Sequence, residues 1–272
     1  MLESLTAALY LYSHRFFHSI HAGSQALFEG FWMGVLPDTV TDIIAQRSYN
    51  DGKAYTDSAY LDSGLQFWEE IAVSRFFQPG SRVLVASAGG GRELIALARA
   101  GYTADGFECS RPMVSTGNKA LSLRGIGSRL QWAPPCRIPE ISECYDAAII
   151  GWNGYTYISP AERRISFMKS LLPHLRPGAP VLVSVAMRTS AGVASLTPRI
   201  ANLIRVLTFR APAFTTGATF PGRPRHQFTP EQLGAELVAA GYSPAAFWKW
   251  GGYGAAVCLK SPVTEPHTNV DR

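Results

Sequence analysis

The sequence lacks three features, and each absence excludes a class of protein. No apolar run reaches the ~18 residues that a membrane-spanning helix needs. The N-terminus is apolar, but it carries Glu3 and has no basic leader of the kind that a signal peptide shows. The four cysteines form no CxxC pair. We therefore expect reduced thiols, no metal site, no membrane partner and a cytoplasmic protein.

Charged residues are also scarce, at 17% of the chain, whereas hydrophobic residues make up 47%. This balance is typical of a well-buried globular core. The 272 residues are enough for one α/β domain of about 200 residues with an added element. A net charge of +5 is too small to indicate a nucleic-acid partner, and none is expected.

The most informative stretch is residues 82–110, RVLVASAGGGRELIALARAGYTADGFECS. Val83, Leu84 and Val85 predict a strand buried on both faces. Three consecutive glycines follow at positions 89–91, where a backbone without Cβ atoms can turn sharply and approach a ligand. Leu94, Ile95, Leu97 and Ala98 then predict a helix, and a second strand should end at Glu108. This order is typical of one nucleotide-binding half of a doubly wound sheet.

Each part of this unit has a physical role toward a ligand. The helix that begins near Arg92 directs its first N–H groups at the glycine turn, which favours a polar or anionic ligand there. Glu108 can accept hydrogen bonds from both hydroxyls of a ribose, and its spacing from Gly89 is close to the roughly 20 residues expected between loop and acid. The pattern is not G-x-G-x-x-G, however, because Ser87 and Leu94 replace two of its glycines.

The stretch resembles the first motif of class I S-adenosylmethionine-dependent methyltransferases, an acidic residue followed by x-G-x-G-x-G. Ser87, Gly89 and Gly91 take the glycine positions, and Glu108 matches the acid that binds the ribose, with Cys109 beside the cofactor. The resemblance implies an α/β, Rossmann-like, doubly wound, seven-stranded and mostly parallel sheet that binds S-adenosylmethionine. One position departs from the motif: Val85 stands where the family has a carboxylate that helps to hold the methionine end. A Rossmann-like domain that binds another nucleotide, or none, is the alternative.

Later segments extend the resemblance to about residues 80–188 and 226–260. Residues 129–132 predict a third strand, followed by WAPPC without the family's frequent Asp, so Trp132 or backbone groups would contact the adenine. Residues 145–151, YDAAIIG, predict a fourth strand that brings Gly151 and Trp152 to the cofactor. The next loop, GWNG, lacks the Asn/Asp-Pro-Pro-aromatic motif for methylating nucleobase amines. LLPHLRPGAPVLVSV and the C-terminal segment resemble the family's fifth strand and its hairpin, whose last strand is antiparallel.

The N-terminal part, residues 1–78, predicts a helical cap and lid before the first strand. His14, His18 and His21 share one helical face, but no Asp, Glu or Cys completes a ligand set, so packing is favoured over metal binding. Residues 47–70 place tyrosines among turn residues, typical of a segment over a partly wet site. By the resemblance, Tyr60 and Trp68 would contact the cofactor from this lid; a plain aromatic contact with the sheet is the alternative.

The methyltransferase domain is expected over residues 79–265, with an insertion at about 189–226 after the fifth strand and a tail over 266–272. Ile200, Leu203, Ile204 and Leu207 predict an amphipathic helix in the insertion. Asp and Glu are absent from Arg163 to Pro230, while six arginines accumulate there at positions 188–225. The insertion would therefore cap a small-molecule acceptor with an anionic group; an ordinary solvated basic face is the alternative.

The function that the resemblance implies is methyl transfer to a small molecule. If the acceptor must lose a proton, the candidate bases are His226, Tyr155 and Tyr157. A catalytically silent domain that binds the cofactor or a partner remains an alternative, as does another use of the cofactor on the same fold. A homodimer is also left open.

Overall fold

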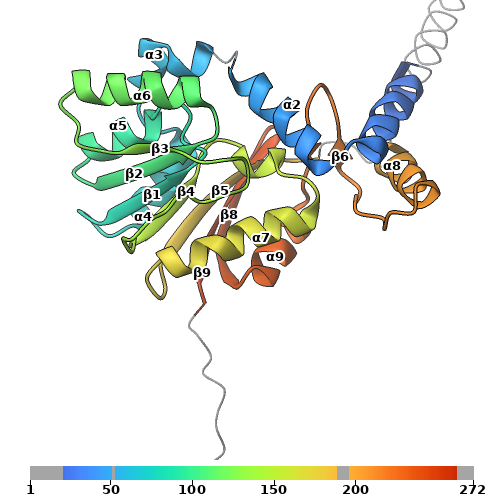
Figure 1. Cartoon of the computed structure of the whole chain (residues 1–272). Coiled ribbons are helices and arrows are strands. Elements are labelled where there is room, and N and C mark those ends of the chain that lie inside the picture. Colours follow the sequence, from blue (N-terminus) through green and yellow to red (C-terminus); the bar gives the residue numbers. More distant parts are fainter. Residues whose placement is uncertain (1–20, 51–52, 189–195, 262–272) are drawn as a thin grey trace, which may run out of the picture.

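The computed structural model describes residues 21–50, 53–188 and 196–261. A seven-stranded sheet organises them, in the order β3-β2-β1-β4-β5-β9-β8 (Figure 1). Its strands are β1 (Arg82–Ala86), β2 (Thr103–Glu108), β3 (Leu130–Trp132), β4 (Ala147–Ile150), β5 (Pro180–Ala186), β8 (Tyr242–Trp250) and β9 (Tyr253–Lys260). β1 to β5 are parallel, and β9 is antiparallel to both of its neighbours. The predicted fold class, including the antiparallel last strand, is confirmed.

Helices cover both faces of the sheet. One face carries α4 (Phe67–Phe76), α5 (Arg92–Arg99) and α6 (Arg111–Leu123), and the other carries α7 (Ala161–Leu171) and α9 (Pro230–Ala239). Alternate strand residues supply the two cores: Val83 and Val85 pack toward the first set of helices, Leu84 and Ala86 toward the second. Because both faces are covered, the central strands are apolar throughout, as their sequences predicted.

The N-terminal part is helical, but its tyrosine-rich segment differs from the expected loop. A helix covers residues 21–35, followed by α2 (Asp38–Asn50), a 3-10 turn η1 (Lys53–Thr56) and α3 (Ser58–Leu61). Tyr49 therefore lies on the last turn of α2. Of the predicted histidine row, His14 and His18 lie outside the described residues, as does the tail 266–272, and His21 is exposed.

The insertion contains the predicted helix, α8 (Leu196–Leu207), and also a small antiparallel pair, β6 (Ala218–Thr219) and β7 (Arg225–His226). α8 packs against the 21–35 helix rather than against the sheet (Figure 1). A Cβ atom on Gly30 or Gly34 would lie within 3 Å of Ile200 or Ile204, so these glycines allow the two helices to touch. A third core, with Met33, Ala201, Ala218 and Phe220, joins the insertion to this helix.

Candidate functional site

The turn after β1 follows a path that few residues other than glycine accept. Gly89 has a φ of 54° and Gly91 a φ of 92°, both in the left-handed region. Ser87 adopts a φ of 55°, an uncommon value for a residue with a Cβ. Gly91 then precedes α5 directly, as its N-cap. The glycine-rich turn therefore presents backbone and the first turn of α5 to the space above the sheet.

Glu108 ends β2 beside this turn, and backbone N–H groups fix its carboxylate. Gly89 donates to Oε2 at 3.0 Å, and Cys109 and Ser110 donate to Oε1 at 2.7 and 3.0 Å. Glu108 is buried but lines a cavity. Its carboxylate thus links the glycine-rich turn to the end of β2 and turns toward that cavity in a fixed orientation, as a ribose-binding acid requires.

The cavity has a volume of about 290 Å³ and lies at the carboxyl ends of β1, β2 and β4. This is where open α/β sheets bind their ligands. Of the residues predicted to bind the cofactor, those that line it are Tyr60, Ser87, Gly89, Glu108, Cys109 and Trp152. The other lining residues include Tyr49, Tyr55, Glu93, Met113, Pro134, Cys136, Arg137, Asn153, Phe167 and Tyr253.

The tyrosine-rich segment lies across the glycine-rich turn. A Cβ atom at Gly90 would be 2.3 Å from the carbonyl oxygen of Tyr55, so the two backbones are in direct contact. Tyr55 and Tyr60 meet edge to face at 5.7 Å, and both line the cavity. That this segment acts as a lid stays a prediction.

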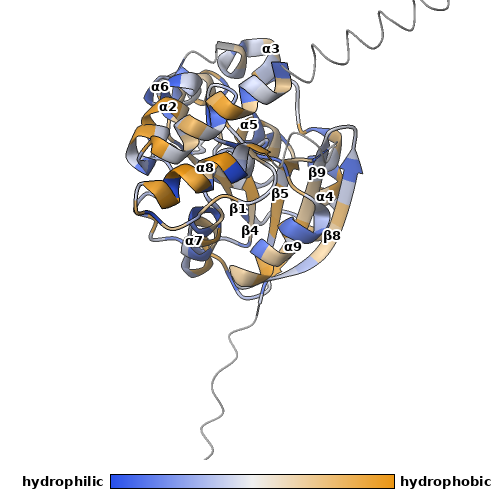
Figure 2. Cartoon of the chain, turned by 90° about the vertical axis from the view of Figure 1, so that its right-hand side faces the viewer, coloured by the Kyte–Doolittle hydropathy of each residue, from blue (hydrophilic) through white to orange (hydrophobic). Residues whose placement is uncertain are grey.

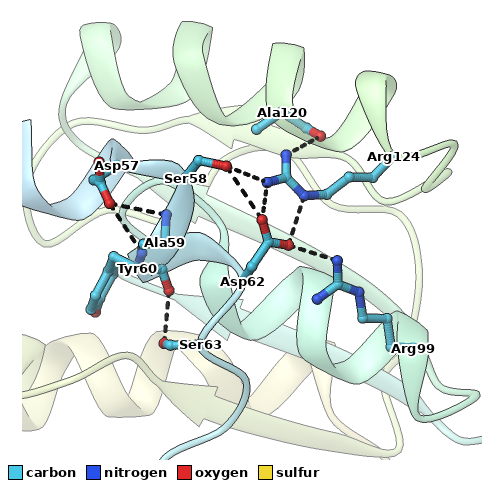
Figure 3. A network of polar contacts seen from close by, with 9 residues as sticks. All are labelled: Asp57, Ser58, Ala59, Tyr60, Asp62, Ser63, Arg99, Ala120 and Arg124. Carbon is cyan, nitrogen blue, oxygen red and sulfur yellow. Dashed lines mark hydrogen bonds and ion pairs between the residues drawn. The ribbon is translucent and has the colours of Figure 1, made fainter.

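α3 fastens one end of this segment to the outer helices (Figure 3). The Asp57 side chain caps the N-terminus of α3 by accepting from Ala59 and Tyr60 N–H. Just beyond the helix, Asp62 pairs with Arg99 of α5 and Arg124 after α6. Motion of the segment would therefore involve η1, ahead of this anchor.

We predict that S-adenosylhomocysteine slows amide hydrogen exchange in residues 53–61 by at least about tenfold, because ligand contacts suppress the local opening that exposes their amides. α9, which does not line the cavity, serves as the internal control and should exchange at an unchanged rate. Equal exchange of residues 53–61 with and without ligand would mean that the segment is a packing contact and not a lid.

A buried charge cluster adjoins the cavity behind Tyr60. The Arg92 guanidinium donates to both oxygens of Glu69, at 2.7 and 2.8 Å, and to Glu93 Oε1 at 2.7 Å. All three side chains are at most 5% exposed. Burial, followed by the charge of Glu69, raises the pKa of Glu93 to about 7, although Arg92 opposes the shift. With both carboxylates ionised the cluster has a net charge of −1, and Glu93 brings that charge to the cavity wall.

An aromatic group supports the part of the cavity wall that Trp152 and Tyr253 form. Trp152 and Tyr253 line the cavity with their rings 6.2 Å apart. Trp68 is buried behind Trp152 at 5.8 Å and stacks on Trp250 at 4.4 Å. Trp68 does not line the cavity; it supports the lining residue Trp152.

Three other residues predicted to bind the cofactor lie close behind the cavity lining. Trp132 donates from Nε1 to the Cys109 carbonyl at 2.9 Å, and the Arg111 guanidinium covers its ring at 3.6 Å. Gly151 faces the glycine-rich turn, where a Cβ atom would be 2.3 Å from the Ser87 carbonyl oxygen. Gly91 acts through its backbone conformation, described above. None of the three is a lining residue.

The three candidate bases are separated by the fold, and of the three only Tyr157 lines the cavity. His226 is buried against Phe228 at 4.5 Å, and burial, with Arg164 and Arg188, lowers its pKa to about 3. It is therefore neutral near pH 7, but it does not reach the cavity. Tyr155 is fully buried, and its hydroxyl donates to Glu236 at 2.9 Å.

Tyr157 belongs to an aromatic stack that also contains Arg223 of the insertion. The Arg223 guanidinium lies 3.9 Å from the centre of the Tyr157 ring and 4.7 Å from that of Tyr49. The two rings meet edge to face at 5.9 Å. Burial raises the pKa of Tyr49, against the opposing charge of Arg223. No residue of the described insertion lines the cavity itself.

Sequence reasoning missed several lining residues. Asn153 has a φ of 58° and donates from its backbone to Ser184, while its buried Oδ1 has no hydrogen-bond partner in the described part of the chain. Asp42 of α2 lines the cavity and pairs with Arg163 at 2.8 Å. Asn153 could have been found from the sequence, because it stands between Trp152 and Gly154 directly after a buried strand. No local pattern could have predicted that Asp42 pairs with Arg163, because the two residues are 121 positions apart in the sequence.

No protein-family model matches the sequence, and no curated protein matches it either. Solved structures do. A 1,6-didemethyltoxoflavin N1-methyltransferase from Burkholderia thailandensis, with its substrate and S-adenosylhomocysteine bound, has a TM-score of 0.60 and 16% identity over 84% of this chain and 92% of its own. An S-adenosylmethionine-dependent methyltransferase from Methanosarcina mazei has a TM-score of 0.56 and 15% identity over 73% and 99%.

The chain has the class I methyltransferase fold. Identities of this size show the fold alone, and the fold is shared by proteins of other activity. The (4+2)-cyclase SpnF matches with a TM-score of 0.55 and 16% identity, over 71% of this chain and 80% of its own. Activity must therefore be argued from this chain's own residues.

Proposed function

We propose that the protein is an S-adenosylmethionine-dependent methyltransferase of a small-molecule acceptor. The observation that carries the proposal is the convergence of the glycine-rich turn, Glu108 and the tyrosine-rich segment on one cavity at the carboxyl ends of β1, β2 and β4. A flat basic surface would suit a nucleic acid. A concave cavity with aromatic side chains in its walls suits a small molecule.

The residues present fit the cofactor. Glu108 would hold the ribose hydroxyls, because backbone N–H groups already fix its carboxylate at the end of β2. Cys109 and Met113 would flank the adenine at the end of the cavity nearest α6. When bound, the cofactor supplies an electrophilic methyl group on a positively charged sulfur. Asp42 is paired with Arg163, and the remaining charged lining residues, Glu93, Glu108 and Arg137, leave an excess of negative charge, which favours a positively charged group on the ligand.

The methionine end needs a separate explanation, because Val85 replaces the carboxylate expected there and is fully buried. The Arg92–Glu69–Glu93 cluster supplies a substitute. Its net charge of −1 is buried, and a charge without a counter-ion in such a place is costly. An α-ammonium group beside Glu93 would neutralise the cluster. We therefore assign the ammonium of the methionine moiety to Glu93.

This assignment predicts a pH dependence. The pKa of Glu93 is about 7 in the free protein. An ammonium group is held better by the ionised carboxylate, so affinity for S-adenosylhomocysteine, through its α-ammonium, should rise severalfold between about pH 6 and about pH 7. Glu93→Gln should weaken binding and remove this rise. Methylthioadenosine, which lacks the amino-acid end, should bind both proteins equally at either pH; a pH dependence that survives in Glu93→Gln would refute the assignment.

The acceptor would occupy the part of the cavity between Tyr49, Tyr157, Cys136 and Phe167. Because these walls are mainly aromatic or apolar, an acceptor with a planar or apolar body is favoured. Arg137 is the charged group placed to meet an anionic substituent, and Asn153 Oδ1 offers an acceptor for a hydrogen-bond donor. Of the insertion's arginines, Arg223 supports this region by stacking on Tyr49 and Tyr157.

Catalysis would rest mainly on positioning. The cavity lining contains no histidine, and His226 is buried elsewhere. Methyl transfer needs a nucleophile in line with the methyl carbon, and the walls can hold it there. Tyr157 is the one predicted base that reaches the cavity, so an acceptor with a weakly held proton is favoured over an alcohol.

Calorimetric titration with S-adenosylmethionine and S-adenosylhomocysteine tests the first step. Binding of both, followed by release of S-adenosylhomocysteine when pooled phenols, thiols and amines are added, would support the methyltransferase. Binding without turnover on any pool would favour the cofactor-binding domain or a cyclase-like use of the fold. Absence of binding would refute all three.

A further inference from the structure

The 21–35 helix is apolar on both sides, although only one side is covered. Ala26, Met33 and the two glycines face the protein, with Gly30 and Gly34 against α8. The other side exposes large apolar residues, and the exposed fraction of each is between 37% and 65%. These residues are Leu27, Phe28, Phe31, Trp32 and Val35. A helix that is hydrophobic all round is normally buried on all sides. Something is therefore expected to cover the exposed side.

The partner helix extends the same surface. α8 exposes Leu203, Val206 and Leu207, each by more than half, and Phe209 just after it is completely exposed. Both helices lie on the side turned toward the viewer in Figure 2, where apolar residues colour most of α8. We call the exposed residues of the two helices the apolar face. Isolated exposed apolar residues are ordinary, but a contiguous group of this extent marks an interaction site.

The charge exposed on the α8 side of the apolar face is positive. Arg199 is exposed on α8, whereas Arg205 and Arg210, at its end, are half-buried and donate to the carbonyl groups of Ala211 and Gly34. From Arg163 to Pro230 the sequence contains no Asp or Glu. The 21–35 helix has a single carboxylate, Glu29, which is buried and accepts a hydrogen bond from the backbone of Phe220 at 2.8 Å. Arg199 therefore flanks the apolar face without a described carboxylate on α8, and the exposed anion nearest along the chain is Asp38, three residues after Val35.

We propose that the apolar face binds the surface of an anionic lipid bilayer. Phenylalanine, tryptophan and leucine would enter the boundary between headgroups and acyl chains, and Arg199 would reach the lipid phosphates by its flexible stem. In two copies of the face placed together, neither α8 would offer a carboxylate to Arg199 of the other, which disfavours a second copy as the occupant. No described helix is long and apolar enough to cross a membrane. The proposal departs from the sequence-based expectation of no membrane partner and is independent of the methyltransferase proposal.

The position of the face is compatible with a working cavity. The 21–35 helix and α8 project from one end of the molecule, beyond α2 (Figure 1). The residues of the apolar face do not line the cavity. The protein could therefore lie on a bilayer without lipid entering the site.

Sedimentation of the full chain with lipid vesicles tests the proposal. Vesicles of phosphatidylcholine mixed with phosphatidylglycerol should bind the protein, and vesicles of phosphatidylcholine alone should bind it at least about fivefold more weakly. Leu207→Gln should reduce binding about tenfold, since a leucine can no longer enter the apolar layer. Arg199→Gln should reduce binding to the anionic vesicles about fivefold, and added salt should act in the same direction.

Leu123→Gln is the matched control, because Leu123 is 86% exposed on α6, away from the face. It should bind like the unchanged protein, and all variants should keep the same melting temperature. Failure to sediment with either vesicle would overturn the proposal. So would a dimer in sedimentation equilibrium that dissociates in Leu207→Gln but not in Leu123→Gln, because the face would then be covered by a second copy.

Discussion

Arg92→Met is expected to lower the free energy of unfolding by about 3–5 kcal/mol near pH 8, the range for removing one partner of a buried ion pair. Arg92 is 1% exposed and donates to both Glu69 and Glu93. Methionine fills a similar volume, so the loss measures uncompensated charge more than an empty space. Urea unfolding followed by circular dichroism gives the value.

The loss in Arg92→Met should shrink as the pH falls. The folded-state pKa of Glu93 is already about 7, above its ordinary value, and removal of Arg92 raises it further. A group with a raised folded pKa contributes stability below its unfolded pKa and loses it as the pH rises through the folded one. At about pH 5 Glu93 is protonated in the folded protein, so the variant should recover part of its stability. A loss independent of pH would contradict the charge explanation.

Arg99→Met is the matched control. Arg99 lies on the same helix and pairs with Asp62, but its side chain is 51% exposed (Figure 3). Surface pairs contribute little because water screens them. We expect a much smaller change in Arg99→Met, with the same value at both pH values.

Glu108→Ala is expected to weaken S-adenosylmethionine binding by about 1.5–3 kcal/mol, the range for losing hydrogen bonds to a charged group. The substitution also frees the backbone N–H groups of Gly89, Cys109 and Ser110. Glu108→Gln is intermediate, since the charge is lost but the one amide oxygen can still accept either from Gly89 or from Cys109 and Ser110. Calorimetry should rank the affinities as unchanged protein, then Gln, then Ala.

Glu140→Ala is the control. Glu140 is exposed in a loop, so this variant should bind S-adenosylmethionine with unchanged affinity. An unchanged affinity in Glu108→Ala itself would remove this residue from the ribose site. It would also weaken the case that the glycine-rich turn binds a nucleoside.

Features formed by residues close together in the sequence were mostly predicted, and features that join distant residues mostly were not. The glycine-rich turn and Glu108 lie within one strand–helix–strand unit, so local patterns were enough to predict them and the fold. The Glu93 cluster requires Glu69, which is 23 residues before Arg92, and its net charge becomes informative only when its burial is known. Val85 indicated that a carboxylate was missing, but not which residue takes its place.

The candidate bases show the same limit. His226 and Tyr155 were selected by residue type, and tertiary packing placed them against Phe228, at 4.5 and 5.6 Å, rather than at the cavity. Tyr157 reaches the cavity because the 3-10 turn Gly154–Tyr157 (η2) follows β4 directly. The insertion's amphipathic helix was predicted correctly. Its contact with the 21–35 helix was not, because that contact depends on Gly30 and Gly34, and hydrophobic periodicity does not identify glycines that allow two helices to touch.

A crystal structure with S-adenosylhomocysteine bound tests the central proposal most directly. We predict that the ligand lies in the cavity with its ribose hydroxyls on Glu108, its ammonium beside Glu93, and its sulfur facing the space between Tyr49 and Tyr157. A ligand bound elsewhere, or one whose sulfur opens onto a wide, shallow, basic groove, would contradict a small-molecule methyltransferase acting at this cavity.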